Sequence, residues 1–143
     1  MHLAIDGYGG DVEKMKSPQE VCSFLDTFPG TIGMTKITEP VVRTYRGPVP
    51  EDWGISGFVV IAESHISVHT FPDRSFVQLD VFSCQEFDTE KALKEICRIF
   101  SFQAVKTWTI QRGLEYYEPQ MALPGRVGSP SVEGPITVEG VWR

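Results

Sequence analysis

Apolar residues at helical spacing predict two helices. The first is expected over about 18–28, after a capping signal at Ser17 and before the Pro-Gly pair at 29–30. The second is expected over about 89–101, where Asp88 is a suitable N-cap and apolar residues recur every three or four positions. Each helix therefore has one apolar face that needs a partner.

Runs of β-branched and aromatic residues predict the strands. Regular strands are indicated at about 2–8, 56–62, 65–71, 75–83 and 104–112. A further run, 35–45, has a similar composition, but Pro40 interrupts it. Because proline cannot donate a ladder hydrogen bond, we expect an edge strand or a broken strand there. The run at 56–62 is nearly all apolar, which is typical of a strand covered on both faces.

The order of these elements, β-α-β-β-β-β-α-β, sets the fold class. Two helices with one apolar face each can cover one face of a sheet. We therefore predict an α+β fold, a two-layer α/β sandwich whose mostly antiparallel sheet has both helices on the same face. This domain is expected to span residues 1–118. From 119 to 143 Pro and Gly dominate the composition, and a flexible C-terminal tail is predicted.

Composition and charge narrow the possible partners. The 143-residue chain has a net charge of −6 and its basic residues form no stripe, so nucleic acid is not an expected partner. No apolar run approaches the roughly 20 residues that span a bilayer, and the first residues do not resemble a signal peptide. The three cysteines are widely spaced, which favours reduced thiols in a cytoplasmic protein. Cys22 and Cys97 lie on apolar helix faces and are expected in the core.

The candidate chemistry centres on Glu63-Ser64, a link between two predicted strands that has no Gly, Pro or Asn to form a tight turn. A serine held in such a strained link can attack its own preceding carbonyl and convert the peptide bond to an ester. β-Elimination then breaks the chain, and the resulting dehydroalanine hydrolyses to a pyruvoyl group. The reaction needs a polarising donor near the carbonyl and a base near the Ser64 Cα proton. Ser56 and His69 are candidates if their strands are neighbours.

Other interpretations of these residues stay open. Ser64 could be an ordinary turn serine, His69 a half-buried strand residue and Cys84 a core thiol. A zinc hydrolase could use His65, His69 and Cys84, because histidines four residues apart on a strand share a face. No carboxylate has matching spacing, so no metal is expected. The chain could also be a regulatory subunit that kept the fold and lost the chemistry.

The stretch G-I-S-G-F-V-V-I-A-E-S-H-I-S-V-H-T-F-P-D, followed by L-D-V-F-S-C, closely resembles the bacterial and archaeal S-adenosylmethionine decarboxylase proenzymes. The resemblance covers residues 1 to about 115 and is strongest over 54–84. It implies autocatalytic cleavage into a β chain, residues 1–63, and an α chain that begins at residue 64. It also implies the same two-layer sandwich, paired into a homodimer of αβ units.

The resemblance implies a role for each central residue. Ser64 would become the covalent pyruvoyl cofactor and Glu63 the new C-terminus of the β chain. His69 would be the processing base, assisted by Ser56, and Cys84 would donate the proton in decarboxylation. The pyruvoyl ketone would form a Schiff base with the amine of the small-molecule substrate and act as the electron sink when CO2 leaves.

The implied substrate is S-adenosylmethionine, whose decarboxylated product feeds spermidine and other polyamine biosynthesis. Two positions depart from the family. Pro50 stands where an aromatic residue stacks on adenine, and Asp73 where a glutamate holds the ribose hydroxyls. Trp53 and Phe71 are candidates to rebuild the stack, and Asp6 lies near where the family's site receives an acidic residue. The alternative is a pyruvoyl-dependent arginine or ornithine decarboxylase on the same fold.

Overall fold

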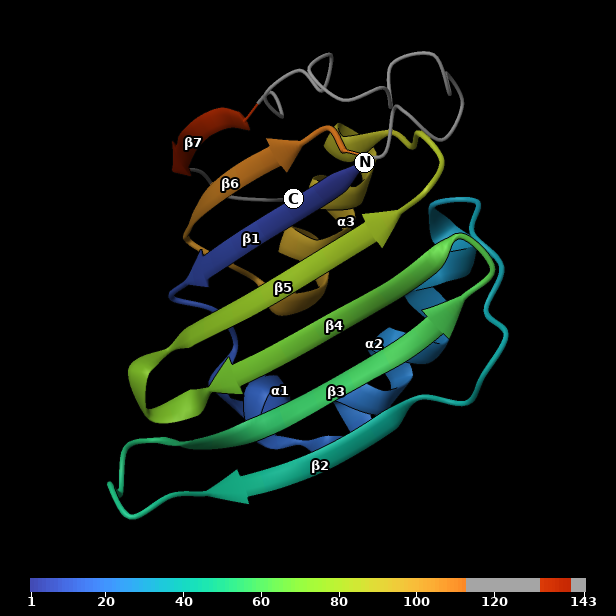
Figure 1. Ribbon diagram of the computed structural model, residues 1–143. Helices are drawn as coiled ribbons and strands as arrows, with labels where there is room; N and C mark the ends of the chain where they lie inside the picture. The colour runs from blue at the N-terminus through green and yellow to red at the C-terminus, as the bar shows by residue number, and fades with distance from the viewer. Residues whose placement is uncertain (113–131, 140–143) are drawn as a thin grey trace, which may run out of the picture.

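The computed structural model describes residues 1–112 and 132–139, and arranges them in two layers (Figure 1). One layer is a seven-stranded sheet in the order β2-β3-β4-β5-β1-β6-β7, and every neighbouring pair is antiparallel. The strands are β1 His2–Tyr8, β2 Val41–Arg46, β3 Trp53–Ile61, β4 Ser64–Phe71, β5 Phe76–Ser83, β6 Ala104–Ile110 and β7 Val132–Glu139.

The second layer consists of helices α1 Val12–Lys16, α2 Pro18–Thr31 and α3 Thr89–Phe100, all on one face of the sheet (Figure 1). A short 3-10 helix, η1 Pro72–Arg74, joins β4 to β5. Within the described ranges, no helix has the length and apolar character needed to cross a bilayer. The predicted α+β sandwich, with its helices on one face, is confirmed.

The core fills the space between the sheet and the helices. Along β4, Ile66, Val68 and Thr70 are buried, whereas His65 and His69 are exposed on the opposite face. This alternation follows from the two-residue period of a strand. We call the side of the sheet that the helices leave uncovered the open face. The helices contribute large apolar side chains to the core, among them Val21, Phe24, Leu25, Phe28, Ile96 and Phe100.

A buried threonine ties the first helix to the sheet. The hydroxyl of Thr70 donates to the Met15 carbonyl oxygen and accepts from the Ile55 backbone N–H, each at 2.9 Å. Gly54 allows this close packing, because a Cβ there would lie 1.7 Å from the carbonyl oxygen of Thr70. Buried polar groups thus help to fix the register of β3 against β4, and with it the residues at both ends of that hairpin.

One helix prediction was wrong in detail, and one helix was not predicted. α2 does not end at residue 28 but continues through Pro29 to Thr31. Proline is tolerated there because it lies in the last turn, where its missing N–H removes one helical bond and its carbonyl accepts from Ile32. The short α1 was not predicted. It begins after the N-cap Asp11, whose carboxylate accepts two backbone N–H groups, and it is too short to show a period.

The strand predictions hold with shifted ends and one addition. β2 begins only after Pro40, so the run 35–40 forms no regular strand, and β2 lies at the edge of the sheet. β3 begins at Trp53, earlier than predicted. Residues 132–139 of the predicted flexible tail form β7, which pairs with β6. The remaining tail residues, 119–131 and 140–143, lie outside the described residues, and the boundary at 118 stays a prediction.

Candidate active site

The turn between β3 and β4 is unusually short for its sequence. Ile61 pairs with Ser64, so only Ala62 and Glu63 form the loop. Two-residue hairpin loops normally need Gly, Asn or Asp at positive φ. Neither loop residue has a positive φ; Ser64 has one instead, at 153°. This backbone region is almost restricted to glycine and costs a residue with a side chain about 1–3 kcal/mol. The strain therefore lies on the serine of the predicted cleavage site.

The carbonyl that Ser64 would attack has a hydrogen-bond donor. The backbone N–H of Cys84 donates to the Glu63 carbonyl oxygen at 2.8 Å. The contact arises because Ser64 pairs with Ser83 at the end of β5, which places the next residue beside the turn. A donor on this oxygen stabilises the negative charge that develops when a nucleophile adds to the carbonyl. The sequence offered Ser56 as the polarising donor, but within one chain the donor on this oxygen is the main-chain N–H of Cys84, an exposed residue.

The chain's first residue fixes the end of β5. The Met1 ammonium donates to the Ser83 carbonyl oxygen at 2.5 Å, and the Ser83 N–H donates to the Met1 carbonyl oxygen at 2.9 Å. Burial lowers the pKa of the Met1 amino group. The fully buried Ser83 hydroxyl accepts from the Gln85 N–H at 2.9 Å. These contacts hold the backbone that carries the Cys84 donor.

Ser56 and His69 form a pair on neighbouring strands. They face each other across β3 and β4, and the Ser56 Oγ lies 2.9 Å from the His69 Nδ1. The condition set from the sequence, that their strands are neighbours, is therefore met. However, His69 is five residues from Ser64 along β4, which at about 3.3 Å per residue is a separation of about 17 Å. The structure therefore brings Ser56 to His69, but brings neither of them to Ser64 of the same chain.

Three candidate substrate-binding residues, Trp53, Phe71 and Asp73, lie toward the end of β4 that is farthest from Ser64. The Trp53 indole Nε1 donates to the Asp73 carboxylate at 2.8 Å, and the Arg46 guanidinium lies 4.7 Å from the Trp53 ring centroid. The Phe71 ring stacks on Phe76, with 5.7 Å between the centroids. Phe71 is the last residue of β4, whereas Ser64 is the first. Both groups of contacts lie toward the end of β4 that is opposite the strained turn of the same chain.

The remaining candidates are spread over the open face. Asp6 is half-buried in the middle of β1, opposite Gln78 of β5. His65 packs against the Phe82 ring at 5.4 Å between centroids. His65 and His69 are four residues apart on β4, about 13 Å, so they cannot bind the same metal ion. This separation argues against the zinc site considered from the sequence.

The sequence missed one polar cluster on the open face. The His2 Nε2 lies 2.8 Å from the Asp80 carboxylate, whose other oxygen is 3.5 Å from the Ser67 hydroxyl. The two-residue period of β5 puts Asp80 on the open face, but its contacts with β1 and β4 depend on strand register, which sequence patterns do not reveal. Of the helix cysteines, Cys97 is buried, which raises its pKa to about 12 and leaves the thiol unreactive near neutral pH. Cys22 is half-buried.

Comparisons with known proteins identify one family. A family model described as S-adenosylmethionine decarboxylase matches residues 1–113. The S-adenosylmethionine decarboxylase proenzyme of Pyrococcus furiosus is 44% identical over 116 residues, which is 80% of this chain and 78% of that protein. The proenzyme of the same name from Archaeoglobus fulgidus is 30% identical over 113 residues, or 78% of this chain and 96% of that protein.

One further relative and one solved structure match different shares of this chain. With the S-adenosylmethionine decarboxylase proenzyme of Pyrococcus horikoshii the identity is 48%, but the alignment covers 63 residues, 43% of this chain and 45% of that relative. Among solved structures, the adenosylmethionine decarboxylase of Aquifex aeolicus superposes with a TM-score of 0.59 at 26% identity, covering 74% of this chain and 83% of that one. The two-layer fold is therefore shared with that enzyme.

Strain at Ser64 predicts that glycine is more stabilising than alanine at this position, the reverse of the usual order in a strand. In uncleaved chains we expect Ser64→Gly to be more stable than Ser64→Ala by about 1 kcal/mol. Relief of about 1–3 kcal/mol of strain outweighs the roughly 0.5–1 kcal/mol that glycine costs in a strand. Urea unfolding measures the difference.

Ser67, on the same strand and without a positive φ, is the matched control. There the glycine variant should be less stable than the alanine variant by about 0.5–1 kcal/mol. If the glycine variant is less stable than the alanine variant at residue 64 as well, Ser64 is not strained.

Proposed function

This chain belongs to the S-adenosylmethionine decarboxylase family, and we propose that it is a self-processing decarboxylase whose pyruvoyl group is made from Ser64. One observation carries the proposal: the bond expected to break joins a strained Ser64 to a Glu63 carbonyl that accepts a hydrogen bond from the Cys84 N–H. Cleavage there gives a β chain of residues 1–63 and an α chain of residues 64–143.

The turn supports the first step of processing. The Ser64 Oγ adds to the Glu63 carbonyl carbon, and the oxygen that takes up the negative charge already accepts from the Cys84 N–H. The C–N bond then breaks, the nitrogen takes a proton, and an ester joins the two residues. The backbone strain at Ser64 favours this shift, because loss of the peptide bond releases it.

A base completes the cleavage. It removes the Ser64 Cα proton, the electron pair forms a Cα–Cβ double bond, and the Cβ–Oγ bond breaks, so that Glu63 leaves as a carboxylate. The dehydroalanine that remains takes up water and loses ammonia, which yields the ketone. We assign the base to His69, whose imidazole is oriented by the Ser56 hydroxyl at 2.9 Å.

A second copy of the chain is proposed to bring this base to the turn. The Ser56–His69 pair lies about 17 Å from Ser64 of its own chain. The open face that carries the pair also carries exposed apolar side chains: Phe58 is 45% exposed, and Val41, opposite it in the sheet, is 40% exposed. We therefore propose a homodimer of αβ units in which the open faces meet and each site uses residues of both copies.

The pyruvoyl group, once formed, supplies the electron sink for loss of CO2 from the substrate. We assign Cys84 as the proton donor to the carbon that loses CO2. Its backbone N–H is bonded to Glu63, next to Ser64, and Cys84 is exposed. S-adenosylmethionine is the proposed substrate. Trp53, held by Asp73, offers an aromatic face for adenine where Pro50 offers none.

Intact-mass measurement tests self-processing. The purified protein should contain two chains, with the cut between residues 63 and 64 and no free amine at the start of the α chain. Ser64→Ala should give one folded chain without activity, because the nucleophile is missing. A single 143-residue species with full decarboxylase activity contradicts the proposal.

Mixed dimers test the shared site. Ser64→Ala lacks the nucleophile and His69→Ala lacks the base, so neither chain alone should be processed. When the two are expressed together, the His69→Ala chain should be cleaved, because its Ser64 meets the His69 of the other copy. Absence of cleavage in a mixture shown to contain mixed dimers argues against a base from the second copy.

A substrate comparison tests the assignment. S-adenosylmethionine, arginine and ornithine are offered separately to the processed enzyme, and CO2 release is measured. We expect turnover of S-adenosylmethionine, and a lower kcat/KM for Trp53→Leu by about 10-fold or more, since a base–aromatic stack contributes about 1–3 kcal/mol. Preferential release of CO2 from arginine or ornithine identifies the alternative decarboxylase.

A further inference from the structure

The β3–β4 turn is held by a segment distant in sequence. Residues 35–38, which precede β2, run beside the end of β3 and are called the clamp segment below. The Ala62 N–H donates to the Thr35 carbonyl oxygen at 2.8 Å, and the Thr35 N–H donates to the Glu63 carboxylate at 3.3 Å. Both residues of the two-residue loop are therefore bonded to the same residue of the clamp segment.

The clamp segment is fixed along β3 by further bonds. The Ile37 N–H donates to the Val60 carbonyl oxygen at 3.1 Å, and the Val60 N–H donates to the Thr38 hydroxyl at 3.2 Å. A β-bridge pairs Lys36 with Ile61, the last residue of β3. This short stretch replaces β2 as the neighbour of β3 at the point where the chain enters the strained turn.

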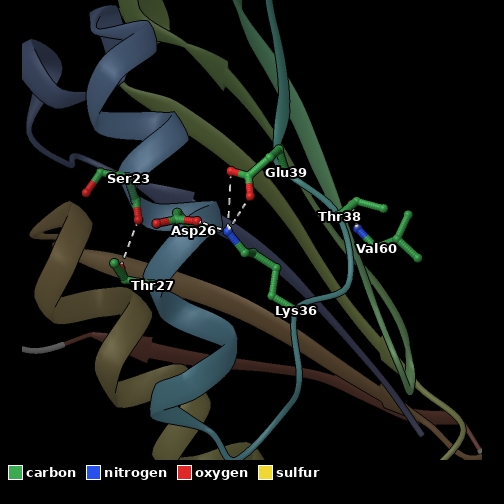
Figure 2. Close-up of polar contacts among 7 residues, drawn as sticks. All are labelled: Ser23, Asp26, Thr27, Lys36, Thr38, Glu39 and Val60. Carbon is green, nitrogen blue, oxygen red and sulfur yellow. Dashed lines mark hydrogen bonds and ion pairs between the residues drawn. The ribbon is translucent and has the colours of Figure 1, made fainter.

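Lys36 joins the clamp segment to the helical layer. Its ammonium forms an ion pair with Asp26 of α2, and it lies 3.3 Å from the nearer carboxylate oxygen of Glu39 (Figure 2). The hydrogen bond with Asp26 raises the pKa of Lys36 above its ordinary value, so the ammonium stays charged at neutral pH. On the other side of Thr35, the Met34 side chain is buried and its N–H donates to the Pro29 carbonyl oxygen at 2.9 Å.

We propose that the clamp segment maintains the strained geometry of the β3–β4 turn, and that Lys36 is a positioning residue for self-processing. Ala62 and Glu63 lack the conformational preferences that two-residue turns need, so their conformation depends on outside contacts. When the clamp segment loosens, Ser64 can relax toward ordinary extended backbone, and its hydroxyl loses its position at the Glu63 carbonyl. This inference rests on the proposed self-processing and deepens it.

The test compares rates of self-cleavage. Lys36→Met keeps most of the side chain's volume but removes the ion pairs, and Asp26→Asn removes the charge of the partner. Each should slow cleavage of freshly refolded chain about two- to fivefold, the range expected from loss of an exposed ion pair. Lys36→Arg should restore most of the rate. Arg98→Met, which removes the i,i+3 pair with Glu95 on α3, is the matched control and should leave the rate unchanged.

Two further readouts distinguish positioning from general stability. High salt should slow cleavage of the natural chain but not of Lys36→Met, because screening weakens only an ion pair that is present. The decarboxylation rate per cleaved chain should be unchanged in Lys36→Met, since the strained bond no longer exists after processing. A separate comparison tests the hydrogen bond between Thr35 and Glu63. Glu63→Gln keeps an acceptor for the Thr35 N–H and should cleave faster than Glu63→Ala.

The outcomes separate this inference from the function on which it rests. Failure of the natural chain to cleave overturns self-processing itself. If the natural chain cleaves normally and Lys36→Met and Asp26→Asn cleave at the same rate as the natural chain, the clamp alone is overturned. Circular dichroism of each substitution in the uncleaved Ser64→Ala chain checks that it folds. A variant that slows cleavage only in proportion to a loss of folded protein also counts against the clamp.

Discussion

The structure depends on a hairpin turn that is too short for its sequence. Ala62 and Glu63 close β3 onto β4 without a glycine or asparagine, and the positive φ that the turn requires appears at Ser64 instead. Strain of about 1–3 kcal/mol is small beside a peptide-bond cleavage barrier, but it is localised at the bond that has to react. The Cys84 N–H on the adjacent carbonyl oxygen adds electrostatic stabilisation at the same place.

The sheet determines which groups can meet. An extended strand separates the turn from His69 by about 17 Å within one chain, so a complete site requires a second source of the base. The same rigidity keeps Ser56 paired with His69 and keeps Trp53 bonded to Asp73. The chain thus has the strained turn at one end of β4 and the Ser56–His69 and Trp53–Asp73 pairs toward the other end, and the open face is where another copy can join them.

Sequence patterns predicted the layers of the fold and a strained link at Glu63-Ser64, because strand alternation and the lack of turn residues are local signals. The Cys84 N–H contact could not be predicted, since it depends on the register of β5 against β4. The ion pair between Lys36 and Asp26 could not be predicted either, because it depends on how residues 35–38 lie against α2. The distance between Ser64 and His69 was available from the predicted strand itself, because strand rise alone keeps the two residues apart.

The central claim is that Ser64 attacks the Glu63 carbonyl and forms an ester before the chain breaks. The most direct measurement is to add hydroxylamine to chain that is in the course of processing and to identify the new C-terminus by mass spectrometry. The account predicts a hydroxamate on Glu63, together with an α chain that retains an intact serine at residue 64. A fragment 1–63 with only a plain carboxylate at every time point, paired with an intact Ser64, would mean simple hydrolysis and would contradict the account.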